Sequence, residues 1–285
     1  MKTVHFVRHG ETEQNKDGIW QGHTNTQLSK TGKAQAKLLS KRINLKNQTV
    51  FTSDLARAKE TAYFLSDSPN VRENLREINV GDFTGKSVKE TYSNNLDIFD
   101  ALQYDTYVFP NGESVQEFKL RVQKEVDHIF DNIDEDSECV VVTHGFFIGT
   151  AIGLVLGFNQ YPYPIGNIQN TSISTVIKRD SVMQVNKFND AIHLPNSYID
   201  YPAKDKSRIL TFIRHGQTDS NTQGVWQGHV DNPLNTYGVE TAKQLKGKFS
   251  NYDLYLSSSF KRALETISLI AVSYTHLTLP TTFGV

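Results

Sequence analysis

The feature that most constrains this chain is a long internal repeat. Residues 6–32, FVRHGETEQNKDGIWQGHTNTQLSKTG, return as residues 212–238, FIRHGQTDSNTQGVWQGHVDNPLNTYG, at a constant offset of 206 residues. A second stretch, residues 53–61, returns as residues 258–266 at an offset of 205 residues. Solenoid repeats have periods of roughly 20–50 residues. A period this long therefore indicates two copies of a whole domain.

The repeat and the local composition together predict the domain organisation. Residues 195–207 contain prolines and mixed charge and lack periodic apolar residues, as linkers do. We therefore expect a complete domain over residues 1–194, a linker over 195–207 and a truncated second copy over 208–270. Residues 271–285 no longer resemble the first copy, and we expect them to be a non-native tail that resembles a translated adapter fragment.

Composition excludes several classes of protein. The net charge is -1, from 30 Lys and Arg against 31 Asp and Glu, so no bulk basic field draws the chain to nucleic acid or to an anionic membrane. The single cysteine excludes a disulfide framework, and the nine histidines lack metal-ligand spacing such as HExxH. Histidines outside the motifs, such as His23, are expected to be structural or solvent-facing.

Targeting signals are also absent from the sequence pattern. Arg8 and His9 come too early for a signal-peptide core of roughly 7–15 apolar residues. The longest apolar stretch, residues 146–158, is shorter than the ~20 residues of a membrane span. We therefore expect a soluble, cytoplasmic protein that uses no metal and no cofactor and that binds neither nucleic acid nor membrane.

Strand and helix patterns alternate along the first 190 residues. Short apolar runs predict strands at residues 3–7, 49–52 and 140–142, with a closing hairpin of residues 171–177 and 182–188. Apolar residues at helical spacing predict helices at residues 28–43, 54–65, 114–133 and 145–156. This alternation indicates an α/β sandwich with a mostly parallel sheet.

Three predicted strands end in chemically reactive residues. They lead to His9, to Ser53 with Arg57 shortly after it, and to His144. Ligands of such sheets bind beyond the carboxyl ends of the strands, so we expect these side chains to converge. The paired N–H donors of an arginine guanidinium can bind two oxygens of a tetrahedral oxyanion such as phosphate. An imidazole that lies between positive charges has a lowered pKa and therefore stays neutral, as a nucleophile must. With a carboxylic acid to protonate the departing oxygen, this set could transfer a phosphoryl group through a phosphohistidine without a metal.

Five motifs stand in order along the same region. They are residues 7–12 with Asn15 and residues 21–22, residues 53–61, residues 75–78 with 81–85, residues 110–114, and residues 143–145. The ordered set resembles the signatures of the histidine phosphatase superfamily, the phosphoglycerate mutase-like proteins. Thr84 departs from the pattern, because glutamate is commoner there.

The resemblance implies a fold and a set of roles. The expected fold is a three-layer α/β/α sandwich with a mostly parallel central sheet, plus the partial second copy. His9 would be the nucleophile and Glu77 the proton donor. The phosphate pocket would consist of Arg8, Arg57 and His144, and the substrate contacts of Gly10, Thr12, Asn15, Gln21 and Gly22.

Structural roles compete with these assignments. Taken alone, Arg57 could be an ordinary helix-face charge, and His144 could be a core imidazole at the end of an apolar strand. Glu73 and Glu90 lie in the same region as Glu77, and only the motif context favours Glu77. The recurrence of the His9 and Arg57 motifs in the second copy favours the functional interpretation.

Three functions remain open. A phosphomonoesterase that acts on small phosphorylated metabolites is favoured over phosphoglycerate mutase-type transfer, because the 67 residues from Glu77 to His144 leave little room for the larger lid insert of such mutases. A non-catalytic phosphoester-binding module is the third possibility, against which the intact His9, Glu77 and His144 argue. Residues 87–111, where specificity is expected to lie, carry no recognisable motif.

The second copy repeats only the nucleophile half of the pattern. His215 and Arg262 correspond to His9 and Arg57, but no acidic residue follows Glu265 and no second histidine motif appears. We expect that this copy is not a complete enzyme. We also expect it to leave an apolar sheet face uncovered, which favours disorder or aggregation.

Overall fold

The structure is a computed structural model of the 285-residue chain. It describes residues 1–43, 48–94, 107–158, 167–195, 210–246, 252, 254–271 and 277–279. The chain divides into two compact units, Met1–Ser197 and Tyr198–Val285, called the first and second unit below. Most of the expected linker 195–207, most of the expected tail 271–285 and part of the segment 87–111 lie outside the described residues.

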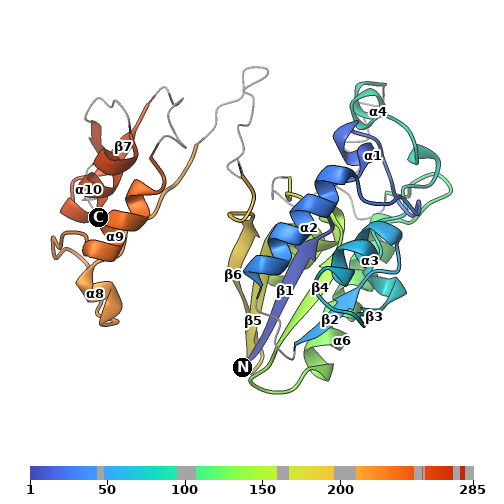
Figure 1. The fold of residues 1–285 in the computed structure, drawn as a ribbon, viewed down its shortest axis with the longest axis horizontal. Coiled ribbons are helices and arrows are strands. Elements are labelled where there is room, and N and C mark those ends of the chain that lie inside the picture. Colours follow the sequence, from blue (N-terminus) through green and yellow to red (C-terminus); the bar gives the residue numbers. More distant parts are fainter. Residues whose placement is uncertain are drawn as a thin grey trace. The chain divides into compact units, whose positions relative to one another are not determined.

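Strands and helices alternate along the first unit, as the sequence predicts, and every predicted strand and helix is present (Figure 1). The strands are β1 (Lys2–Arg8), β2 (Thr49–Thr52), β3 (Asn70–Val71), β4 (Glu138–Thr143), β5 (Ile173–Arg179) and β6 (Val182–Asp190). The helices are α1 (Glu13–Lys16), α2 (Lys30–Arg42), α3 (Ala56–Tyr63), α4 (Val88–Asn94), α6 (Val115–Asn132) and α7 (Gly145–Val155), with 3₁₀ turns at Glu73–Leu75 and Gly81–Phe83.

The sheet has the strand order β3-β2-β4-β1-β5-β6. The pairs β3–β2, β2–β4 and β4–β1 are parallel, whereas β5 pairs antiparallel with both β1 and β6. The predicted α/β fold with a mostly parallel sheet is confirmed. In this order β2, β4 and β1 are neighbours that run in the same direction, so their carboxyl ends lie along one edge (Figure 1).

Two cores cover the two faces of the sheet, because side chains alternate between faces along each strand. On one face, Phe6 and Val141 are fully buried with apolar residues of α6 and α7. On the other face, Val7 and Val140 are fully buried with Leu39 of α2 and with residues of α3. Helices on both faces produce the three-layer sandwich.

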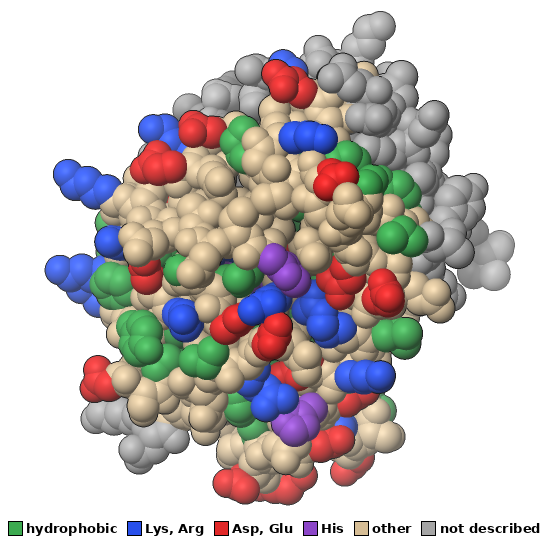
Figure 2. All heavy atoms as spheres, turned by 90° about the vertical axis from the view of Figure 1, so that its right-hand side faces the viewer, with side chains coloured by type: hydrophobic (Ala, Val, Ile, Leu, Met, Phe, Trp, Pro, Cys, Tyr) green, Lys and Arg blue, Asp and Glu red, His purple; other side chains and the backbone are tan. Residues whose placement is uncertain are grey.

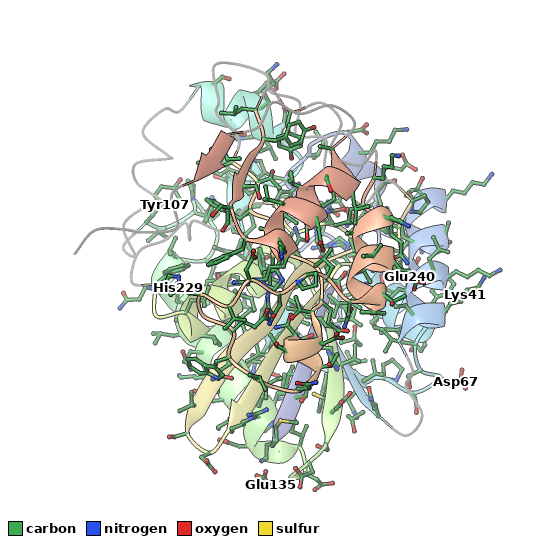
Figure 3. The ribbon with its side chains drawn as sticks, turned by 90° about the vertical axis from the view of Figure 1, so that its left-hand side faces the viewer. Lys41, Asp67, Tyr107, Glu135, His229 and Glu240 are labelled. Carbon is green, nitrogen blue, oxygen red and sulfur yellow. The ribbon has the colours of Figure 1, made fainter. Side chains whose placement is uncertain are left out.

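Local signals explain where the helices begin. The Ser29 hydroxyl accepts a hydrogen bond from the N–H of Gly32 and caps α2, and Ser114 forms a capping box with Glu117 at the start of α6. The exposed residues of α2 are mostly polar. Lys41, in the last turn of α2, is exposed and extends away from the ribbon (Figure 3).

Three short elements are additions to the prediction. The four-residue helix α1 begins at a capping box between Thr12 and Asn15, and α4 and the two-residue edge strand β3 are similarly short. Such short elements carry almost no apolar periodicity, which is why the sequence pattern does not reveal them.

The described elements of the second unit are α8 (Asp219–Thr222), α9 (Thr236–Lys243), β7 (Leu256–Ser258), α10 (Lys261–Ile270) and β8 (Leu277–Leu279), the last pairing in parallel with β7. Residues 210–214, which correspond to β1, form no strand. Phe212 is 92% exposed and Trp226 97%, whereas the corresponding Phe6 and Trp20 are 0% and 6% exposed. These apolar side chains are thus exposed, but they do not lie on a sheet, so the expected uncovered sheet face is not seen at these residues.

Among the described residues, every helix is too short or too polar to cross a lipid bilayer.

Candidate active site

The ends of β1, β4 and β2 bring three reactive side chains together. The N–H of His9 donates to the carbonyl oxygen of Thr143 at 2.9 Å, and the N–H of Ser53 donates to that of Val142 at 3.1 Å. These bonds continue the parallel ladders one residue beyond the strands. His9, Ser53 and His144, which directly follows β4, therefore meet at one edge of the sheet.

The imidazole of His9 is held in a single tautomer. Its side chain is 3% exposed, and Nδ1 lies 2.7 Å from the carbonyl oxygen of Gly10. Because a carbonyl only accepts, Nδ1 carries the proton. Nε2 lies 3.3 Å from Nε of Arg57, which only donates. Both contacts thus leave the lone pair of His9 on Nε2.

This imidazole is also kept neutral. Burial is the largest cause that holds the pKa of His9 well below its ordinary value, and the positive charges of Arg57 and Arg8 lower it further. The hydrogen bond to Gly10 opposes them. The sequence argument considered only the arginines, and the structure adds burial as the larger effect. A neutral imidazole with its lone pair on Nε2 is a nucleophile at that atom.

Arg57 connects the helix α3 to the loop after Trp20. Its guanidinium is 1% exposed, and Nη1 and Nη2 donate to the carbonyl oxygens of Thr24 at 2.7 Å and of Gly22 at 2.8 Å. Burial lowers the pKa of Arg57 to about 10, so it remains positively charged at neutral pH. A fixed positive charge therefore lies directly beside Nε2 of His9.

The second imidazole, that of His144, is fully buried. Its ring centroid is 5.1 Å from that of His9, and its Nε2 lies 2.9 Å from Oγ of Ser53. Its Nδ1 is buried without a hydrogen-bond partner among the described residues. Burial, followed by the charge of Arg57, holds the pKa of His144 well below its ordinary value. His144 is therefore a neutral ring with one nitrogen free for a ligand.

Arg8 contributes a second guanidinium. Its Nη1 donates to the carbonyl oxygen of Ile168 and lies 3.5 Å from Oδ1 of Asn167. Its Nε is buried and, like Nδ1 of His144, has no partner among the described residues. Buried polar nitrogens are usually paired, so these two atoms are candidates to bind an external group.

Glu77 approaches from the loop after β3. Its carboxylate accepts hydrogen bonds from the N–H groups of Ile78, Phe146 and Phe147, at 3.1, 3.1 and 3.2 Å. Burial raises the pKa of Glu77, and the hydrogen bond from Phe146 and the charge of Arg57 oppose that rise. A carboxyl group with a raised pKa can carry a proton at the pH where the buried histidines are neutral.

The two other acids considered as proton donors, Glu73 and Glu90, are exposed to solvent. Glu73 is 72% exposed and pairs with Arg76, and Glu90 is exposed on α4. Of the three acids that the sequence leaves open, Glu77 is the one whose charge interacts with Arg8 and Arg57.

The five expected substrate contacts surround these groups in different ways. The N–H of Gly10 already donates to Thr61, and the hydroxyl of Thr12 caps α1 and contacts Oε1 of Gln21. The oxygen of Asn15 accepts from the backbone N–H of Thr12 and that of Gln21 accepts from the Thr12 hydroxyl, which leaves the two amide nitrogens as the donors toward a ligand. Gly22 contributes the carbonyl oxygen that holds Arg57. The hydroxyl of Thr12 is thus committed to the fold.

The sequence analysis assigns no role to several residues that the structure places at the site. Ser53 contacts His144, and Thr61 contacts Gly10; both recur in the second copy, as Ser258 and Thr266, and that recurrence is a usable signal. Asn170, which donates to the carbonyl oxygen of His9 at 2.9 Å, has no comparable signal. His23 donates to the backbone carbonyl of Glu77 at 2.8 Å, which is a structural role inside the site.

Charged groups of both signs lie on the surface of the molecule. Figure 2 shows a face on which basic, acidic and histidine side chains lie interspersed, as the near-zero net charge suggests. Within the described ranges, no cluster of three or more His, Cys, Asp or Glu side chains is arranged to hold a metal ion.

Known proteins share this sequence pattern and fold. A model of the "Histidine phosphatase superfamily (branch 1)" matches residues 4–191 and 210–280. A metal-independent phosphoserine phosphatase of Arabidopsis thaliana is 30% identical over 199 residues, which span 66% of this chain and 82% of the plant protein. A protein of an Enterobacter species named "Probable phosphoglycerate mutase" is 28% identical over 213 residues, 72% of this chain and 99% of its own length. The solved structure of a phosphoserine phosphatase mutant from Entamoeba histolytica in complex with phosphoserine has a TM-score of 0.62 and 28% identity, over 68% of this chain and 100% of that one.

Proposed function

This chain belongs to the histidine phosphatase superfamily, and we propose that its first unit is a metal-independent phosphomonoesterase that works through a phosphohistidine at His9. Its relatives are phosphatases and phosphoglycerate mutase-like proteins, so the chain is an enzyme of this group. The proposed substrates are small phosphorylated metabolites.

One observation carries the proposal: nucleophile and anion donors converge. Nε2 of His9 presents its lone pair, while Nε of Arg8 and Nδ1 of His144 are buried and unpaired among the described residues. A phosphoryl oxygen would supply the acceptor that these two nitrogens lack. Arg57, beside Nε2, would stabilise the negative charge of the same group.

The first step follows from the tautomer. Nε2 of His9 attacks phosphorus and forms the N–P bond while the P–O ester bond breaks. Glu77 gives its proton to the departing oxygen, so that an alcohol leaves. The carbonyl of Gly10 accepts the Nδ1–H bond and stabilises the positive charge that the ring acquires.

The second step regenerates the enzyme. Glu77, now a carboxylate, takes a proton from water as the water oxygen attacks phosphorus and the N–P bond breaks. Inorganic phosphate leaves, and His9 and Glu77 return to their starting protonation states. If a different hydroxyl of the same substrate takes the phosphoryl group in place of water, the reaction becomes that of a mutase.

The domain assignment forms part of the proposal: residues 1–194 would be catalytic and residues 208–270 a non-catalytic partial copy. The local geometry of the second unit supports the repeat. His215 Nδ1 lies 2.7 Å from the carbonyl oxygen of Gly216, whose N–H donates to Thr266 at 2.9 Å, as in the first unit. Arg262 likewise donates to two loop carbonyls.

We place the enzyme in the cytoplasm and assign it no nucleic-acid partner. Its one cysteine, Cys139, is buried and free, so the fold does not depend on an oxidising compartment. The near-neutral net charge offers no general attraction for nucleic acid.

The test uses the full chain with p-nitrophenyl phosphate and with 3-phosphoglycerate. Hydrolysis that His9→Ala abolishes and the matched His215→Ala leaves intact supports the phosphatase. Turnover of a radiolabelled ester, quenched in alkali, should trap an acid-labile adduct on His9. Interconversion of phosphoglycerates would instead identify a mutase, and no turnover of either ester would leave a binding module.

A further inference from the structure

The turn at residues 110–114 matches one of the five motifs, but its acidic residue, Glu113, has no role in the proposed reaction. The carboxylate of Glu113 accepts two hydrogen bonds from Arg121 of α6, from Nε at 2.9 Å and from Nη2 at 2.8 Å. The two side chains are 15% and 18% exposed. A pair with this two-point geometry and little exposure holds its partners in a defined orientation.

The other donors of Arg121 reach the loop that carries Glu77. Nη1 donates to the carbonyl oxygens of Asn74 and Arg76, each at 2.9 Å, and Nη2 donates to that of Glu77 at 3.2 Å. A guanidinium has five N–H donors. All five are used here, two on Glu113 and three on the loop.

The turn holds the other flank of the same loop. The N–H of Glu113 donates to the carbonyl oxygen of Asn79 at 2.8 Å, and the N–H of Asn79 donates back to the Glu113 carboxylate at 3.2 Å. A Cβ added at Gly112 would lie 2.4 Å from the carbonyl oxygen of Asn79, so the two backbones approach as closely as only glycine permits. Residues 74–79 are thus held on both sides of Glu77.

We propose that Arg121, anchored by Glu113, is a positioning residue that fixes the loop 74–79 so that the carboxyl group of Glu77 reaches the departing oxygen. This inference rests on the proposed function, because it takes Glu77 as the proton donor. Lysine cannot replace Arg121 in this role, since a single nitrogen with three donors cannot span a carboxylate and three carbonyls.

A matched control is a second arginine that pairs with a glutamate of the same helix. Arg72, which precedes the loop, donates through Nε and Nη2 to the carboxylate of Glu125, a residue of α6 that is 1% exposed. Glu125 also accepts from Nδ2 of Asn74 at 3.2 Å, but Arg72→Lys changes only the Arg72–Glu125 pair and leaves the three hydrogen bonds from Arg121 to the loop in place.

The experiment compares substrates with good and poor leaving groups in the full chain. General acid catalysis contributes about 10²–10⁴-fold, and p-nitrophenolate needs little of it. Arg121→Lys should lower kcat/KM for glycerol phosphate by about 10-fold or more and for p-nitrophenyl phosphate by less than about 3-fold. Arg72→Lys should leave the ratio of the two rates unchanged.

Further variants separate the possible failures. If Glu77→Gln lowers both rates equally, Glu77 is not the proton donor and the proposed function fails at that point. If Glu77→Gln is selective but Arg121→Lys lowers both rates equally, the positioning role is refuted and Arg121 is only structural. In the Glu77→Gln background, Arg121→Lys should not change the ratio further. Should Arg121→Lys fail to fold, Glu113→Gln provides the same comparison, with the same selective loss expected and an equal loss overturning the inference.

Discussion

Replacing Arg57 by lysine isolates the contribution of the guanidinium that touches the nucleophile. In the structure this buried group donates to Nε2 of His9 at 3.3 Å and to the carbonyl oxygens of Thr24 and Gly22 at 2.7 and 2.8 Å. The substitution keeps the positive charge but removes the planar guanidinium group whose three nitrogens make these hydrogen bonds. It therefore tests geometry rather than charge alone.

The magnitude follows from these three contacts. The single nitrogen of lysine cannot span the imidazole and both carbonyl oxygens, so one or both carbonyls lose their partner. Each buried group left unpaired costs about 1–3 kcal/mol, or about 2–6 kcal/mol of unfolding free energy for the two. Loss of a donor to the charge that develops in the transition state costs about 10²–10³-fold in kcat.

The assay measures kcat/KM for p-nitrophenyl phosphate, together with urea unfolding, in the full chain. The second unit offers a matched control, because Arg262 donates to the carbonyl oxygens of Val230 and Gly228 at 2.7 and 3.2 Å. Arg57→Lys should lose about 100-fold or more, and Arg262→Lys should keep the wild-type rate. A rate for Arg57→Lys within about 3-fold of wild type, or an equal loss in Arg262→Lys, would refute the reasoning.

Three further outcomes are expected. Turnover should survive EDTA, because arginines neutralise the phosphoryl charge; a loss that a divalent ion restores would overturn the metal-free mechanism. Because the pKa of His9 is lowered and that of Glu77 is raised, kcat/KM for an alkyl phosphate should fall below the pKa of His9, where the imidazole is protonated, and fall again above the pKa of Glu77, where the proton donor is lost. Glu77→Gln should abolish the alkaline decline, and a profile that keeps it contradicts the assignment. Phe6→Ala should destabilise the first unit by about 3–5 kcal/mol in urea unfolding, whereas Phe212→Ser and Trp226→Ser should reduce aggregation, measured by light scattering, without loss of phosphatase activity.

The convergence of His9 and His144 could be predicted because it depends on local signals and a general rule. Each follows an apolar strand, and parallel neighbours end at the same edge of the sheet. The contacts of Arg121 could not be predicted in this way. Three of its hydrogen bonds go to the backbone carbonyls of residues 74, 76 and 77. Every residue has such a carbonyl, so the sequence does not indicate which ones Arg121 contacts.

The hydrogen-bonding state of each site group was likewise decided by the tertiary structure. Within the described ranges Nδ1 of His144 has no partner while its Nε2 contacts Ser53, and this depends on how α7 and the end of β2 pack against each other. Thr12 is a further example, since its hydroxyl caps α1, a contact that its motif does not reveal.

By itself, the sequence determined the periodicity of strands and helices and the caps of α2 and α6, because these depend on neighbours a few residues away. A comparison of the two copies of the repeat shows what such local signals do not determine. Residues 6–10 and 212–216 are nearly identical, and both histidines bond the following carbonyl, yet only the first segment forms a strand with a buried Phe6. A strand exists only when other strands accept and donate its backbone hydrogen bonds, and β1 obtains these from β4 and β5, more than 120 residues away in the chain.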